Sequence, residues 1–442
     1  MAVTIINGMK YSEGWSLLNS VMGFVSIRMF HWTYAPLQFV FTSLLLNPSM
    51  SFEALLFWGR LPSVMFGVLS IVFMGKTVEV LYSDEKSSEY IKLLMMCLLA
   101  FNSECILYSA QMETYEIGVL CVLLIIIYVY RKVDGAIDYK TSIVMALFCY
   151  AQYQMFIFVF AFYLLFGMVA LVNRDREQVC KIIKSGALMV MIDVPCFAYF
   201  FMGHMYKRGV AWNVGIENKY LFSMDKLNLK YFAEFFIGNY YDYIKYLIIP
   251  GKIDGWSIPL ILITMILSVI GIISLLLKKN KKKYIGLYLG IVLLIYFFLI
   301  FAGALTFSPS RHMLIMVPVT LVLLTQGIYF CYEKIVQPFA KIFSGVLFVY
   351  VVVFLLLFML EIPEQIDIRR NRVTKEQICS LMDKYDVIVA HGYSMEPYIF
   401  LKDVCDIYNE KAKKIDLEHL DRICKVLDCS VDEILEFEDD GN

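Results

Sequence analysis

Long apolar runs separated by short polar segments dominate the sequence. Most of these runs approach or exceed the ~18 residues that a helix needs to cross a bilayer. The runs lie at residues 61–80, 92–108, 117–130, 141–152, 153–173, 183–203, 256–277, 284–305, 312–333 and 341–362. The pattern predicts an all-α polytopic membrane protein with ten visible transmembrane helices.

Positive charge alternates along the predicted loops, because lysine and arginine gather in every second short loop. The basic loops contain Lys76, Lys86 and Lys92; Arg131, Lys132 and Lys140; Arg174, Arg176, Lys181 and Lys184; Lys278, Lys279, Lys281, Lys282 and Lys283; and Lys334 and Lys341. The positive-inside rule assigns these loops to the cytoplasm. Loops 107–116, 204–255 and 305–311 and both termini are then predicted to be extracytoplasmic. The alternation also requires 141–173 to form two helices.

Residues 1–60 do not fit the pattern of a span. The stretch 16–46 is apolar, but Arg28 and His31 lie at its centre. We therefore expect interfacial helices on the outer leaflet. An external N-terminus also leads us to expect a first transmembrane helix upstream of this sequence. The predicted domains are an external segment 1–60, a transmembrane domain 61–362 with external loop 204–255, and an extramembrane tail 363–442.

Composition agrees with a membrane class. The chain is 60% hydrophobic and 18% charged, whereas an ordinary soluble domain is about 25% charged. The 11 cysteines form no CxxC pair and show no metal-ligand spacing. We interpret most of them as small buried hydrophobic side chains.

Four short segments stand out in chain order. They read Y-A-P-L-Q-F from Tyr34, G-R-L-P-S-V-M-F-G from Gly59, Y-S-A-Q-M-E-T-Y from Tyr108 and S-P-S-R-H-M-L from Ser308. Together they resemble motifs of the GT-C superfamily of membrane glycosyltransferases, in its bacterial branch similar to protein O-mannosyltransferases and lipid A aminoarabinose transferases. The match to R-L-P-S-x-x-F-G is the most specific, and the resemblance extends over residues 10–335.

The resemblance implies a GT-C-like helical bundle in a bacterial plasma membrane. It also implies inverting transfer of a sugar from a polyprenyl-phosphate donor to a glycan, lipid or protein acceptor at the outer face. Such a reaction needs a carboxylate that accepts the acceptor's proton and cations that hold the departing phosphate. Glu13 is the candidate base; Ser12 before it stands where the family has an aspartate.

The candidate phosphate and sugar contacts lie in the predicted outer loops. They are Arg60, Tyr108, Gln111, Glu113, Tyr115, Arg311 and His312. Gln111 stands where the family motif has glutamate, and Glu113 where it has arginine. Two ordinary roles stay open: an acid in a first helical turn also favours the helix dipole, and an arginine at this depth also reaches lipid headgroups. Some GT-C enzymes use a divalent metal, so a metal cofactor also stays open, although no tight carboxylate cluster occurs in the sequence.

The tail 363–442 has a different character. The segment Y-D-V-I-V-A-H-G-Y from Tyr385 predicts a strand in a small external cap, and the stretch from Lys413 onward resembles the final helices of Xre/Cro-type repressor domains. Residues 403–412 are too short to supply the rest of a helix-turn-helix. The last residues are acidic, which repels DNA. No nucleic-acid partner is therefore expected.

Two other classes compete with the enzyme. One is a flippase or transporter of a lipid-linked saccharide, which should carry polar groups at mid-membrane depth and repeated halves with broken helices. The other is a truncated, inactive GT-C remnant. The polar features gather at one predicted face and no repeat is visible, which favours the enzyme over the transporter.

Overall fold

The computed structural model describes residues 35–46, 50, 52–82, 88–135, 137–207, 220–226, 228–249 and 257–336, with positions 349, 352, 353 and 356. The chain divides into two compact units, Met1–Gln365 and Ile366–Asn442. All described residues belong to the first unit. The expected strand from Tyr385, and nearly all of the predicted span 341–362, lie outside the described residues.

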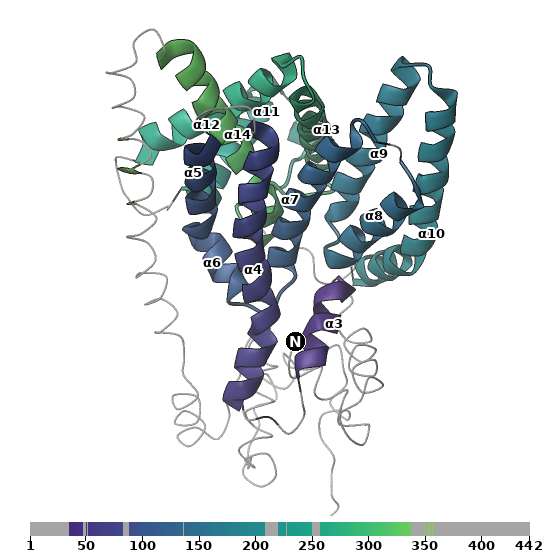
Figure 1. Ribbon diagram of the computed structural model, residues 1–442. Helices are drawn as coiled ribbons and strands as arrows, with labels where there is room; N and C mark the ends of the chain where they lie inside the picture. The colour runs from purple at the N-terminus through teal and green to yellow at the C-terminus, as the bar shows by residue number, and fades with distance from the viewer. Residues whose placement is uncertain are drawn as a thin grey trace, which may run out of the picture. The chain divides into compact units, whose positions relative to one another are not determined.

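Every regular element in this described part is helical, which confirms the all-α class there (Figure 1). The α-helices are α3 (Pro36–Leu45), α4 (Phe52–Tyr82), α5 (Ser88–Ala100), α6 (Ser103–Ser109), α7 (Tyr115–Lys132), α8 (Tyr139–Ala151), α9 (Met155–Val172), α10 (Arg176–Lys207), α11 (Leu229–Tyr243), α12 (Ser257–Leu277), α13 (Lys282–Phe301) and α14 (Val317–Cys331). The 3₁₀ turns are η2 (Met224–Lys226) and η4 (Arg311–Met316), and the π-helical turns are η3 (Ile244–Ile248) and η5 (Tyr332–Val336).

Several of these helices are long and apolar enough to cross a membrane. Five segments qualify in the described chain: Phe57–Tyr82, Met155–Val172, Ile258–Leu277, Lys282–Phe301 and Arg311–Lys334. The pair Ile91–Ala100 and Ser103–Ser109, bent by 57°, makes a sixth if it is counted as one span. The described part of the chain is thus helical and suited to a membrane, and within it fewer helices qualify as spans than the sequence predicted.

Helix boundaries differ from the predicted ones at several places, including α10, which spans Arg176–Lys207 where 183–203 was predicted. Helix α4 begins at Phe52, well before the predicted start at 61, and contains Pro62. A proline inside a helix has no N–H to donate, so α4 continues through Pro62 with one backbone hydrogen bond fewer. The segment 204–255, predicted to be a loop, contains α11, whose N-terminus is capped by Asn228 through a 2.8 Å bond from the Tyr231 amide. The region 141–173 is two helices, as predicted, broken at residues 152–154.

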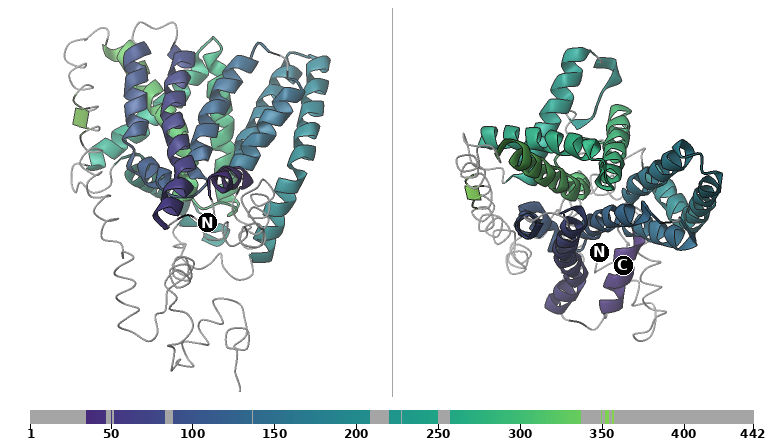
Figure 2. Two further views of the ribbon diagram at one scale, coloured as in Figure 1. Left: turned by 60° about the horizontal axis from the view of Figure 1, so that its bottom comes forward. Right: turned by 45° about the horizontal axis from the view of Figure 1, so that its top comes forward.

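Helices α7 and α14 are the enclosed elements of the bundle. Side chains on all sides of both are buried, as expected of a helix that is hydrophobic all round. In Figure 2 the green helices from the end of the described chain lie beside the purple and blue helices from its start. Segments distant in sequence therefore form one core, and α7 contacts α4, α9, α13 and α14.

Helices α12 and α14 approach each other through glycine. A Cβ atom on Gly271 of α12 would lie 2.7 Å from the carbonyl carbon of Leu323, and one on Gly327 of α14 would lie 2.7 Å from that of Leu267. The contact is reciprocal, so each helix places a glycine against the backbone of the other. Small residues allow such close helix packing in membranes, where van der Waals contact replaces the hydrophobic effect.

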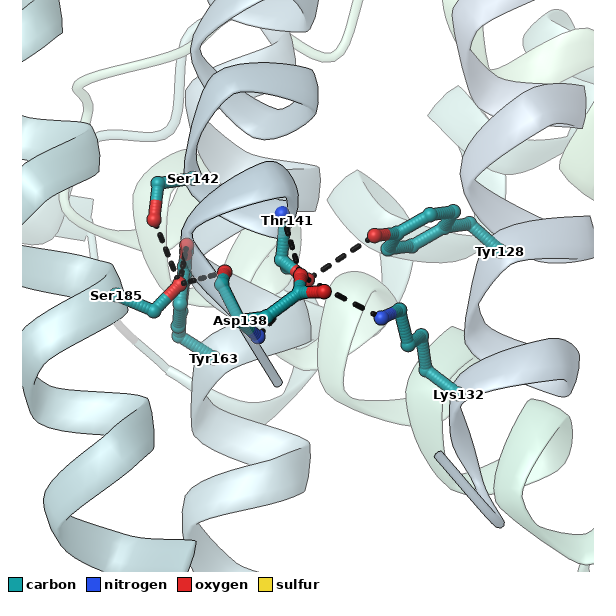
Figure 3. Close-up of polar contacts among 7 residues, drawn as sticks. All are labelled: Tyr128, Lys132, Asp138, Thr141, Ser142, Tyr163 and Ser185. Carbon is teal, nitrogen blue, oxygen red and sulfur yellow. Dashed lines mark hydrogen bonds and ion pairs between the residues drawn. The ribbon is translucent and has the colours of Figure 1, made fainter. Parts of the chain in front are cut away.

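A polar network closes the end of the bundle where α7 leads into α8 (Figure 3). Asp138 caps α8: its carboxylate accepts from the Thr141 amide at 3.0 Å and from the Thr141 hydroxyl at 2.9 Å. Lys132 lies 3.6 Å from the same carboxylate. Partial burial raises the pKa of Asp138, but the bonds from Thr141 and the charge of Lys132 outweigh this effect, so the pKa lies below its ordinary value.

Ser185 of α10 extends this network to two more helices. Its hydroxyl lies 2.9 Å from that of Ser142 and 3.0 Å from that of Tyr163, and it donates to the Asp138 carbonyl at 3.3 Å (Figure 3). An ion pair joins Lys281 to Asp134 in the loop after α7, and another joins Lys278 to Glu333 of η5. Basic loops that the sequence predicted to share one side are thus connected.

Candidate functional site

The segment from the end of α6 to the start of α7 carries four of the predicted site residues, Tyr108, Gln111, Glu113 and Tyr115. Asn102 begins α6, where its side chain accepts from the Cys105 amide at 2.9 Å and donates to the Leu247 carbonyl at 2.8 Å. The second bond anchors α6 to the π-turn η3. The Gln111 amide donates to the Tyr108 carbonyl at 3.1 Å, which turns the chain toward α7. This turn places Glu113 just before the helix.

Glu113 forms an ion pair with Arg311, at the first position of η4. Nη1 of Arg311 lies 3.2 Å and 3.3 Å from the two carboxylate oxygens. The two residues are 198 positions apart in the sequence. Their side chains are 20% and 30% exposed, respectively, so both remain reachable from outside. Burial raises the pKa of Glu113 above its ordinary value, and the guanidinium of Arg311 opposes that rise.

The Tyr115 ring lies against the Arg311 side chain. Its guanidinium carbon lies 5.8 Å from the centroid of the Tyr115 ring, within cation–π range. Tyr115 is buried and contacts the Tyr108 ring at 5.4 Å and the His312 ring at 6.1 Å, both edge to face. The arrangement holds the cation between a carboxylate and an aromatic face, which restricts its orientation.

Two residues that the sequence did not single out form a hydrogen-bonded chain to the backbone carbonyl of Glu113. The amide of Gln38 in α3 donates to the Ser63 hydroxyl at 2.6 Å, and Ser63 donates a long 3.5 Å bond to the Glu113 carbonyl. Both side chains are fully buried. Ser63 follows Pro62 in the motif G-R-L-P-S, so the motif itself was the signal available for it. The sequence indicated Gln38 less strongly, because its only distinction is to be the one side-chain amide in the segment Y-A-P-L-Q-F.

Glu116 lies in the first turn of α7, beside this pair. It is 1% exposed, and in the described part of the chain its Oε1 has no hydrogen-bond partner. Gly67 of α4 allows the approach, since a Cβ there would lie 3.1 Å from Ser109 Cβ and 3.6 Å from Glu116 Oε2. A second carboxyl group thus lies one helical turn beyond Glu113.

The other predicted site residues are placed differently. Arg60 is exposed on α4, and no hydrogen bond or ion pair joins it to the described residues. Gln111 is partly buried in the turn. Glu13 lies outside the described residues. Among the residues that the structure describes, no group of three histidine, cysteine or acidic side chains could hold a metal ion.

The site and the polar network of Asp138 lie at opposite ends of α7. Tyr115 begins this helix and Lys132 ends it. At 1.5 Å per residue, 18 residues separate the two ends by roughly 27 Å, close to the thickness of a bilayer core.

Comparison with known proteins gives one result. Residues 403–440 match the family model of the Cro/C1-type HTH DNA-binding domain, which confirms the resemblance of the tail to repressor domains. No curated protein and no solved structure matches the chain.

The match points toward nucleic acid and contradicts the prediction that the chain has no nucleic-acid partner. It also begins at Asp403, within the segment considered too short for such a domain. A few side chains of a recognition helix read the base sequence, so an acidic segment beside that helix does not exclude DNA binding.

Proposed function

We propose that the helical unit is a membrane glycosyltransferase that takes its sugar from a polyprenyl-phosphate donor at the outer face of a bacterial plasma membrane. The observation that carries this proposal is the pairing of Glu113 with Arg311 against the Tyr115 ring. Two motif segments that resemble GT-C sequences meet in this one pair. The proposal includes the ten predicted spans, with the site end of α7 outside and its Lys132 end inside.

Arg311 would bind the donor phosphate. A guanidinium offers five N–H donors in a planar fork, which matches the oxygens of a phosphate. The two contacts with Glu113 both come from Nη1, and the Tyr115 ring centroid lies 5.8 Å from the guanidinium carbon. Glu113 would therefore orient Arg311, and the Tyr108 and Tyr115 rings would flank the sugar.

The transfer itself exchanges one bond for another. The acceptor hydroxyl oxygen attacks the anomeric carbon opposite the phosphate, the bond from that carbon to the phosphate oxygen breaks, and the configuration inverts. Glu13 would take the hydroxyl proton. The polyprenyl phosphate leaves with its negative charge held by Arg311, with Arg60 as a further candidate.

Glu113→Gln tests this proposal. The amide keeps the size of the side chain but removes the charge that orients Arg311, so we expect sugar transfer to fall about 10-fold to 100-fold. Purified protein would be supplied with radiolabelled sugars on polyprenyl phosphate, and transfer to membrane acceptors would be counted. Glu177→Gln, on the exposed first turn of α10, is the matched control and should keep parental activity. An active parent with an equally active Glu113→Gln variant would exclude this site.

The match at residues 403–440 supports a second candidate function, DNA binding by the tail. This function requires the tail to lie in the cytoplasm, whereas ten spans and the positive-inside rule place it outside. A green fluorescent protein fused after Asn442 should then fluoresce, and an alkaline phosphatase fused there should be inactive. An active phosphatase with a dark fluorescent fusion would remove this candidate.

A further inference from the structure

An apolar cavity of about 300 Å³ lies between α3, α8 and α10, which adjoin in Figure 1. Its walls include Leu37 and Val40 of α3, Ile143, Leu147 and Tyr150 of α8, and Ile192 of α10. Pro36 at the start of α3 completes one rim. The cavity is distinct from the Arg311 site, with which it shares no lining residue.

The side chains that line the cavity are almost entirely apolar. Tyr150 carries the one polar side-chain group among the lining residues, and its hydroxyl donates to the Ile192 carbonyl at 3.0 Å. That bond satisfies the hydroxyl within the wall. An apolar cavity of this kind does not hold ordered water, because a water molecule would lack polar partners. Its occupant must itself be apolar.

The cavity opens toward the surface of the bundle that would face lipid. Its rim residues Val40, Ile143 and Leu147 are 39%, 46% and 49% exposed. Val190 and Val194, in the adjoining part of α10, are 56% and 53% exposed. In a helical membrane protein such side chains meet acyl chains rather than water.

We propose that this cavity binds one acyl chain of a membrane phospholipid. Its volume is about twice that of an engineered apolar cavity that takes up benzene, which leaves room for roughly a dozen carbon atoms of a chain. The walls contain no group that could select a headgroup or a particular lipid, so the most abundant chains of the bilayer fill it. The bound chain fastens the short helix α3 to α8 and α10. This inference requires only that the bundle lies in a membrane and does not depend on sugar transfer.

Lipid retention tests the proposal. The full chain would be purified, washed in excess detergent, and its bound lipids counted by native mass spectrometry. The parent should retain one phospholipid per chain. Val40→Trp and Leu147→Trp each fill the rim from partly exposed positions, and each should reduce the retained phospholipid at least tenfold. Ile266→Trp, 58% exposed on α12, is the matched control and should retain it.

A second measurement covers the case in which a tryptophan variant does not fold. The parent would be reconstituted with a phospholipid that carries a photoreactive diazirine on its acyl chain, and the cross-linked peptides would be sequenced. Cross-links on residues 36–46 and 139–151 are expected. A parent that retains no phospholipid, equal retention by all three variants, retention of polyprenyl phosphate instead, or cross-links that avoid both segments would each overturn the proposal.

Discussion

Arg311→Ala is expected to lower the sugar-transfer rate about 10²-fold to 10³-fold, the usual cost of removing a donor that stabilises developing negative charge. The variant removes the guanidinium from the phosphate and leaves Glu113 without its cation. Transfer would be measured with the labelled polyprenyl-phosphate donors under saturating and limiting donor. Because Arg311 would act on the departing phosphate, kcat should fall more than KM rises.

Arg311→Lys separates charge from geometry. Lysine keeps the positive charge but lacks the planar fork and stacks poorly on Tyr115, so its activity should fall between those of the parent and of the alanine variant. Arg176→Ala, exposed at the start of α10, is the matched control. Equal activity in the parent and the Arg311→Ala variant would show that Arg311 does not bind the phosphate. A lower unfolding temperature of Arg311→Ala, without loss of transfer, would instead indicate a purely structural ion pair.

Gly271→Ala and Gly327→Ala are each expected to destabilise the protein by about 1–3 kcal/mol, the range for overpacking a well-packed core. Each methyl group would overlap a backbone carbonyl of the facing helix, which cannot turn away as a flexible side chain can. The unfolding temperature of the purified protein in detergent would report the loss. The two effects should not add, because one separation of α12 from α14 relieves both contacts.

Glycines elsewhere in the bundle provide the control for these variants. At Gly167 of α9 and Gly290 of α13, a Cβ atom would meet no described atom within 4 Å. Alanine there should be neutral or stabilising by about 0.5–1 kcal/mol, since glycine is the poorer helix former. If Gly271→Ala unfolded at the same temperature as Gly290→Ala, the close contact between α12 and α14 would be absent in the folded protein.

The packing of α12 on α14 also concerns the proposed site. Helix α14 continues directly from η4, whose first residue is Arg311. A displacement of α14 would therefore move the guanidinium relative to Glu113 on the α6–α7 connection. Variants at Gly271 and Gly327 should consequently lose transfer activity along with stability, whereas the Arg311 variants should lose mainly activity.

Much of the helical framework could be predicted from local patterns. The predicted runs 92–108 and 284–305 fall on α5 with α6 and on α13, because the apolar content of a run reports the medium in which the segment lies. The break at residues 152–154 could be predicted from charge alternation. The earlier start of α4 could not be predicted in this way. A proline is common in the first turn of a helix, so Pro62 indicates a helix start locally, whereas in the structure it lies inside α4.

The sequence by itself determined that this chain is built of apolar helices, and it indicated Glu113, Tyr115 and Arg311 as polar groups at helix ends. Only the tertiary structure decided that Glu113 meets Arg311 and that Ser63 and Gln38 support this pair. The physical reason is that hydrophobic pattern and charge describe each segment alone. Which side chains meet depends on how each helix is rotated about its axis, and close contacts such as Gly271 against Leu323 set that rotation between helices.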